Sequence, residues 1–277
     1  MKKSLSLNFP ALLLAMGFSS GTVFAAATAS DTAANYAGSW SASPANLGSG
    51  FGSWANQVIN NDSPPYAGTY MDQTSYGNSD GVLSAGYAWS TYANSPTTVA
   101  PEMILSRSFT AGPSGSSSLY NQTFSVGIAS AGIGGAGSSA SVNIGTAFNL
   151  GYFGGGSDNL SFSVDGGAAT AIPVDFANLN AGLEIALSVS GPLNSLSEGY
   201  TLTLSPFAGG SPIYTTSGTF DSFDYNTSNF SFTDDNTSND QFVNNLNISA
   251  EAVPEPSTLA LSGLSSLGAL FAFRRRK

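Results

Sequence analysis

Short runs in which apolar and polar residues alternate recur through the middle of the chain, between residues 120 and 250. A period of two is typical of a β-strand that buries one face, whereas a helix needs apolar residues three and four positions apart. Glycine and serine interrupt every helical pattern. The alternating sets are Phe124, Val126 and Ile128; Val142, Ile144, Phe148, Leu150 and Tyr152; Leu160, Phe162 and Val164; Leu183, Ile185, Leu187 and Val189; Tyr200, Leu202 and Leu204; and Phe242, Leu246 and Ile248.

These runs predict an all-β domain over residues 26–252. About ten to fourteen short strands suit an antiparallel two-sheet β-sandwich of the jelly-roll, concanavalin-like kind. Asp165-Gly166 follows one run directly, as expected of a hairpin turn. A parallel β-helix is the alternative, but it requires a repeat of fixed period, and none is found. No change in composition divides the region into two domains.

Basic residues are concentrated at the two ends of the chain. Lys2 and Lys3 open the sequence, residues 274–277 close it, and Arg107 is the one base between them. Residues 26–252 therefore carry one base against sixteen acids, a net charge of −15. Such a body repels nucleic acid and anionic membrane surfaces, so a nucleic-acid partner is excluded. The chain also has no His and no Cys, which removes the usual zinc ligands and the usual general base.

The first 25 residues have the pattern of a secretory signal peptide. Two lysines precede an apolar stretch, and small residues follow at the place where signal peptidase cleaves. We expect cleavage between Ala25 and Ala26.

The last 25 residues, 253–277, combine a short motif with an uncharged stretch. Val253-Pro254-Glu255-Pro256-Ser257 precedes residues 258–273, which carry no charge, and Arg274-Arg275-Arg276-Lys277 follow at once. Sixteen helical residues would extend about 24 Å, which is adequate for a short membrane span with basic residues at its end. The basic cluster belongs in the cytoplasm, which places the body on the far side of the inner membrane. Both ends of the chain thus predict the same topology.

This tail resembles the PEP-CTERM sorting domain, whose members share the Pro-Glu-Pro opening, the short apolar span and the terminal arginines. The resemblance covers about a tenth of the chain. It implies a Gram-negative-type envelope, transient insertion in the inner membrane, and processing near Pro254-Glu255-Pro256 by an exosortase. It also implies a cell-surface or extracellular destination and an association with exopolysaccharide and biofilm.

The body resembles lectin-like β-sandwich proteins that carry the same tail. The residues concerned are short motifs, and the resemblance implies fold more than function. They are Gly50–Trp54, Ala88–Tyr92, Arg107–Phe109 and Phe242–Ala250.

No arrangement of acids in the sequence predicts an enzyme. Glycoside hydrolysis needs two carboxyl groups on either side of the sugar bond. Glu184 stands alone among apolar residues, as a solvent-facing strand residue would, and Asp221 and Asp224 fall on opposite faces of a strand. A serine nucleophile would lack a histidine base. We therefore predict a non-enzymatic structural or adhesive protein, with a secreted glycoside hydrolase as the remotest alternative.

A lectin-like carbohydrate-binding protein is the nearer alternative. Aromatic rings stack on sugar faces when they are exposed, although large aromatic residues more often lie in the core. Trp54, Trp89 and Tyr92 are the candidates for stacking on a sugar.

Acidic residues near the end of the body define a candidate calcium site. Calcium binds six to eight oxygen atoms, often from one loop. Asp234, Asp235 and Asp240 supply carboxylates, but the segment lacks the spacing of an EF-hand, and a polar turn between two strands explains it equally. No other cofactor is predicted.

Arg107 shares its strand phase with Met103, Leu105 and Phe109, which form an apolar face. A charge on that face must be paired. We therefore expect a structural ion pair with one of the sixteen acids.

Overall fold

A computed structural model describes fourteen stretches of the chain. They are residues 26–36, 46–59, 67–73, 87–93, 102–109, 119–130, 139–153, 159–174, 178–179, 181–192, 198–221, 223, 229–235 and 241–252. The predicted signal peptide and the tail from 253 onward lie outside these residues.

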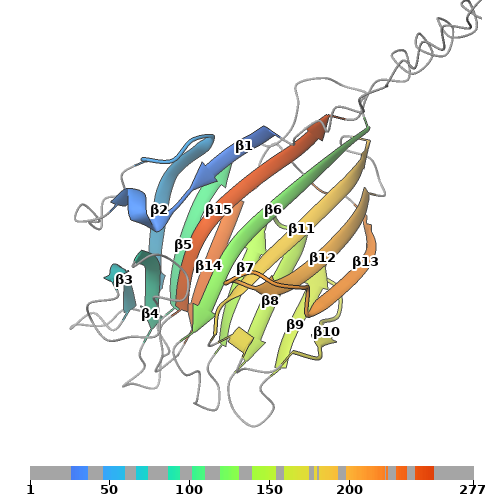
Figure 1. The fold of residues 1–277 in the computed structure, drawn as a ribbon. Coiled ribbons are helices and arrows are strands. Elements are labelled where there is room, and N and C mark those ends of the chain that lie inside the picture. Colours follow the sequence, from blue (N-terminus) through green and yellow to red (C-terminus); the bar gives the residue numbers. More distant parts are fainter. Residues whose placement is uncertain are drawn as a thin grey trace, which may run out of the picture.

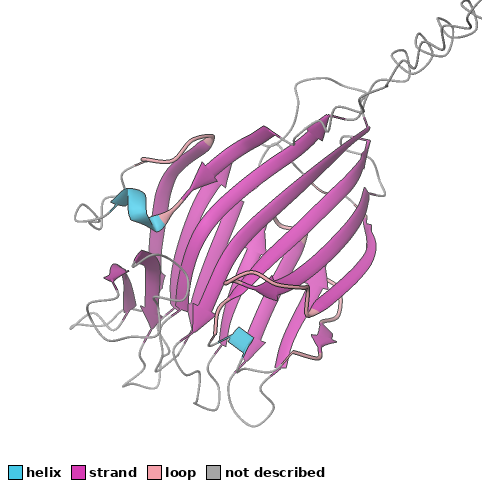
Figure 2. Ribbon diagram, in the orientation of Figure 1, coloured by secondary structure: helices cyan, strands magenta, loops and turns pink. Residues whose placement is uncertain are grey.

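Two β-sheets lie face to face and make up nearly all of the described structure (Figures 1 and 2). The larger sheet has eight strands. In order across the sheet they are β13 (Tyr214–Phe220), β12 (Glu198–Pro206), β11 (Leu183–Pro192), β6 (Leu119–Ser130), β15 (Gln241–Ala252), β4 (Tyr87–Ala93) and β3 (Ala67–Gln73), with β1 (Ala26–Asp31) paired to β15 beside β4.

The second sheet has seven strands. Their order is β10 (Thr170–Ile172), β9 (Asn159–Val164), β8 (Phe148–Phe153), β7 (Ser139–Ile144), β14 (Asn229–Asp235), β5 (Glu102–Phe109) and β2 (Phe51–Ile59). A short 3-10 helix, η1 (Ala33–Tyr36), follows β1.

Every strand pairing in the two sheets is antiparallel. The chain also passes repeatedly from one sheet to the other. Along the chain, β5 of the smaller sheet is followed by β6 of the larger and then by β7 of the smaller. In the same way, β13 of the larger sheet is followed by β14 of the smaller and then by β15 of the larger. This exchange of strands is typical of a jelly roll. The predicted antiparallel two-sheet sandwich is therefore confirmed.

Apolar side chains between the sheets form the core. Residues 183, 185, 187 and 189 of β11 are buried while Glu184 is exposed, as the alternation predicted. Phenylalanine rings join the layers: the centroids of Phe109 and Phe124, from opposite sheets, lie 5.3 Å apart. Most strands bury one face only, so the opposite face of each sheet is largely polar. Parts of β6 and β15 bury both faces, and Ala88, Ala129 and Phe242 form a separate buried cluster.

Two turns break the alternating sets. Residues 142–152 alternate in a single phase in the sequence, but they form two strands. A turn over residues 145–147 separates β7 from β8, and Gly145 in that turn has a positive φ of 62°. The predicted turn at Asp165-Gly166 is confirmed, with φ values of 51° and 67° and a hydrogen bond from the Gly167 N–H to the Val164 carbonyl.

A β-bulge corrects the prediction for the last strand. The register with β6 shifts between Asn244 and Asn247, and Asn245 has a left-handed φ of 52°. The extra residue changes which side chains face inward. Leu246 and Ile248 join the main core, as Val243 does, whereas Phe242 packs in a separate cluster. Phe242 thus does not share a face with Leu246, contrary to the sequence pattern.

The first and last strands lie side by side. Ala26 pairs with Ala250, and Asp31 pairs with Leu246. β1 occupies the part of the β15 edge that β4 leaves open, since β4 pairs only with residues 241–243. The start of β1 and the end of β15 therefore lie at the same end of the sandwich.

Candidate functional site

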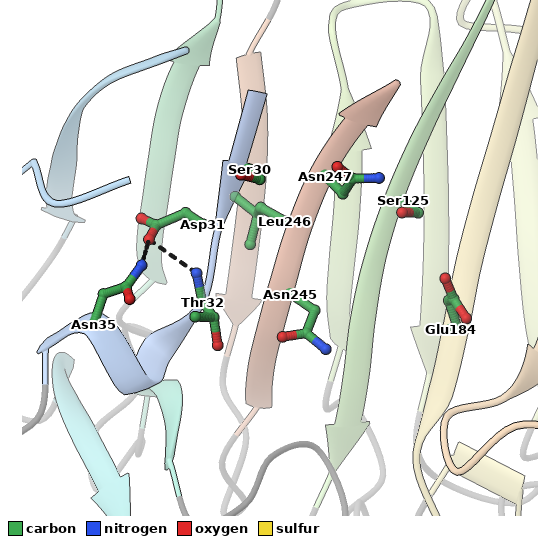
Figure 3. A pocket seen from close by; sticks show the side chains of 9 residues that line it. All are labelled: Ser30, Asp31, Thr32, Asn35, Ser125, Glu184, Asn245, Leu246 and Asn247. Carbon is green, nitrogen blue, oxygen red and sulfur yellow. Dashed lines mark hydrogen bonds between the residues drawn. The ribbon is translucent and has the colours of Figure 1, made fainter. Parts of the chain in front are cut away.

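A depression of about 400 Å³ lies on the outer face of the larger sheet. We call it the first depression. Its lining comes from the end of β1 and the next residue (Ser30–Thr32), from Asn35 of η1, from Ser125 of β6, from Glu184 of β11 and from Asn245–Asn247 of β15. Figure 3 shows Asn247, Ser125 and Glu184 following one another across three adjacent strands.

The bulge in β15 shapes one side of the first depression. The Asn244 side-chain oxygen accepts hydrogen bonds from the backbone N–H of Ala33 and of Asn245, both at 2.8 Å. It also accepts a bond of 3.1 Å from the Thr32 hydroxyl. These bonds hold the bulge against the start of η1, so that the exposed Asn245 lines the depression.

Three polar side chains in the first depression have unused hydrogen-bonding capacity. Ser125 is only 8% exposed, yet within the described residues its hydroxyl has no protein partner. The Asn247 amide and the Glu184 carboxylate likewise have none there. A hydroxyl and an amide both donate and accept, and a carboxylate accepts. The first depression therefore suits a ligand rich in hydroxyl groups.

A second depression of about 300 Å³ lies next to the first on the same face. It is lined mainly by hydroxyl side chains of β6, β11, β12 and β15. These are Thr123, Ser188, Ser190, Thr201 and Ser249, together with Asn121 and Val189.

Asp31 forms the wall of the first depression and is fully engaged. One carboxylate oxygen accepts from the Thr32 N–H at 2.9 Å and from the Asn35 amide at 2.8 Å, as Figure 3 shows. The other oxygen accepts from the Tyr36 hydroxyl at 2.7 Å and forms an ion pair with Arg107. Asp31 is therefore a structural carboxylate rather than one available to a ligand.

Arg107 confirms the prediction of an ion pair on an apolar face. Its guanidinium also donates to the Gly52 carbonyl at 2.7 Å and to the Asn46 side chain. The rings of Phe51 and Trp54 lie 4.9 and 5.2 Å from its central carbon. Burial lowers the pKa of Arg107 to about 10, so the group remains charged at neutral pH.

The prediction that Trp54 and Trp89 stack on a sugar is wrong. The two side chains are 2% and 0% exposed, and their ring centroids lie 4.7 Å apart inside the core. Tyr36 packs against Trp89 at 5.6 Å. Tyr92 belongs to β4, but its side chain is outside the described part, so stacking by Tyr92 stays a prediction.

Most of the candidate calcium site lies outside the described residues, so the site stays a prediction. Asp234 is buried in β14, where the Thr91 hydroxyl lies 3.4 Å from its carboxylate. The Asp235 side chain and Asp240 lie outside the described residues. Among the residues that are described, no group of three or more acidic, His or Cys side chains could hold a metal.

Residues 252–277 match the PEP-CTERM protein-sorting motif. The chain carries a PEP-CTERM sorting signal. The match begins at Ala252, the last residue of β15, and includes the predicted signal Val253–Ser257 and the basic residues 274–277. A PEP-CTERM motif marks a protein for export and for sorting by an exosortase at the membrane. The predicted span 258–273 lies outside the described residues, within which no helix is long and apolar enough to cross a bilayer.

Several solved structures align with most of this chain. A lectin from Bauhinia forficata in complex with GalNAc is 8% identical, with a TM-score of 0.38 over 72% of this chain and 100% of that chain. The Ca²⁺-bound exoplasmic/lumenal domain of VIP36 is 8% identical, with a TM-score of 0.40 over 70% and 87%. The catalytic domain of a glycoside hydrolase family 131 protein from Coprinopsis cinerea is 15% identical, with a TM-score of 0.42 over 80% and 90%.

No curated protein sequence matches this chain.

Proposed function

We propose that this protein is exported, sorted by an exosortase, and displayed at the cell surface as a non-enzymatic structural or adhesive component beside exopolysaccharide. The observation that carries the proposal is the sorting motif over residues 252–277. It is supported by the predicted signal peptide, which gives the same topology as the basic cluster at 274–277.

The positions of the first and last strands support processing at both ends of the chain. β1 begins at Ala26, directly after the predicted signal peptidase site, and the sorting motif begins where β15 ends. Cleavage at either end would leave both sheets intact. The mature protein would then be the sandwich of residues 26–252 with a short remnant of the motif.

The state of the acids supports a non-enzymatic role. Retaining and inverting glycosidases use two available carboxyl groups across the sugar bond. Glu184 has an unengaged carboxylate in the first depression, but Asp31, which lines the same depression, is neutralised by Arg107 and bonded to three further groups. Turnover of a β-glucan by the purified protein would contradict this part of the proposal and favour the hydrolase alternative.

The sorting step can be tested by mass spectrometry of the mature C-terminus. The chain is produced in a bacterium with an exosortase and in the same strain without one. We expect surface-exposed protein that ends near Pro254–Pro256 in the first strain, and membrane-retained protein with an intact tail in the second. A variant that lacks residues 253–277 is the control, because it should escape surface sorting in both strains. Surface protein that still carries residues 274–277 would contradict the proposal.

A further inference from the structure

The outer face of the larger sheet carries hydroxyl side chains in register across five strands. The strand pairings place Ser249 opposite Thr123, Thr123 opposite Ser188, Ser188 opposite Thr201, and Thr201 opposite Ser217. Adjacent strands are about 4.8 Å apart, so this row extends roughly 19 Å. It crosses the second depression.

A second row runs parallel to the first, two residues along each strand. Asn247 pairs with Ser125, Ser125 with Ala186, Ala186 with Thr203, and Thr203 with Thr215. This row passes through the first depression, where Asn247 and Ser125 lie side by side (Figure 3). The two rows together make one surface, which we call the polar face.

Hydrogen-bonding capacity on the polar face is distributed unevenly. In the first row the hydroxyls of Thr123 and Ser188 bond to each other at 2.8 Å, and those of Thr201 and Ser217 at 3.1 Å. In the first depression Ser125, a residue only 8% exposed, has no protein partner for its hydroxyl among the described residues, and this oxygen is open to the solvent of the depression. A hydroxyl that bonds only to water can exchange that water for a hydroxyl group of a ligand, whereas the paired hydroxyls of the first row would first have to give up a bond to each other. The first depression is therefore where a ligand gains most.

Charge limits the class of ligand. Residues 26–252 carry a net charge of −15, and Glu184 adds a carboxylate to the first depression itself. An anionic polymer would meet repulsion over the whole surface. A neutral ligand with many hydroxyl groups would meet no such repulsion. Its hydroxyl groups could bond to the amides, hydroxyls and carboxylate of the first depression.

We propose that the polar face binds an uncharged polysaccharide, with one sugar unit in the first depression and the following units along the hydroxyl rows. The first row favours an extended chain over a single sugar, since each of its five strands offers a hydroxyl in turn. This inference rests on the proposed function at the cell surface. It adds to that function the face of the protein that binds and the class of ligand.

The test measures binding of the purified full-length chain, in mild detergent, to immobilised glucan, mannan and galactan, with alginate as the anionic comparison. We expect binding to at least one neutral polymer and none to alginate. Ser125→Val and Asn247→Ala should each weaken that binding roughly fivefold, the effect of one lost neutral hydrogen bond. Glu184→Gln should weaken it as well, because an amide accepts less strongly than a carboxylate.

Ser231→Val is the matched control. Ser231 is a half-buried strand residue of the smaller sheet, opposite Ser106 and Asn143, so the same substitution there should leave binding unchanged. Melting temperatures of all variants separate lost folding from lost binding. Preferential binding to alginate, binding to no neutral polymer, or equal binding by the folded variants would each overturn the inference. Surface display that continues despite such a result would leave the proposed function intact.

Discussion

Arg107 and Asp31 form an ion pair in which neither side chain is accessible to solvent. The two residues belong to different sheets, since Arg107 lies on β5 and Asp31 ends β1. The pair therefore fastens the first strand of the domain to the opposite sheet. It also holds the wall of the first depression, which Asp31 lines.

Replacing Arg107 by methionine should lower the melting temperature by roughly 10 °C. The substitution leaves the Asp31 carboxylate buried without its counter-charge, which costs about 3–5 kcal/mol. Thermal unfolding followed by circular dichroism measures the change. The double variant Arg107→Met with Asp31→Asn should recover part of the loss, and an unchanged melting temperature in the single variant would contradict the structural role.

Replacing Gln122 by methionine should raise stability. Gln122 is fully buried in β6, and neither polar atom of its side chain has a hydrogen-bond partner in the part of the chain that the structure describes. A buried polar group without a partner costs about 1–3 kcal/mol, and methionine has a similar shape without that penalty. Urea denaturation should give a higher midpoint with an unchanged slope. A lower midpoint would mean that the amide has a stabilising contact.

Gly127 should not tolerate a larger residue. A Cβ atom at this position would lie 2.2 Å from the ring of Phe207, so the ring must move before the chain can fold. Gly127→Val should destabilise the domain by about 1–3 kcal/mol, as overpacking does. The same substitution in a Phe207→Ala background is the control, because the obstacle is then absent. Equal losses in both backgrounds would show that Phe207 is not the cause.

Calcium should leave the melting temperature unchanged. A ligand that binds only the folded state raises stability with its concentration, but the Asp234 carboxylate is buried beside the Thr91 hydroxyl. Melting curves in millimolar calcium and in EDTA measure the effect. A calcium-dependent rise that disappears in Asp240→Asn would instead support the predicted calcium site.

The sequence predicted the strands well where one face is buried, as in β11, because a period of two records that burial directly. It also predicted that Arg107 would be paired, since its neighbours Leu105 and Phe109 are buried. It could not name Asp31 as the partner. The two residues are 76 positions apart, and any of sixteen acids could have met the arginine.

The polar face was missed for a different reason. Alternation within a strand says which residues face solvent, but the rows of hydroxyls depend on the register between strands, which alternation does not determine. The bulge at Asn245 adds a second difficulty, because a single left-handed residue changes the phase of β15. The prediction for the two tryptophans was wrong because the sequence alone does not distinguish an aromatic residue in the core from one on a binding surface.

The pairing of β1 with β15 has a consequence for the order of events during export. Among the described strands β1 pairs only with β15, and the Ala33 N–H donates to Asn244, 211 positions later in the chain, so β1 cannot join its sheet until nearly all of the domain has been delivered. Such distant contacts form late in folding. In the exported chain that we propose, the N-terminus crosses first, and β1 must wait for β15. The sandwich can therefore close only when the residues just before the sorting motif have emerged, so that completion of the fold and arrival of the motif coincide.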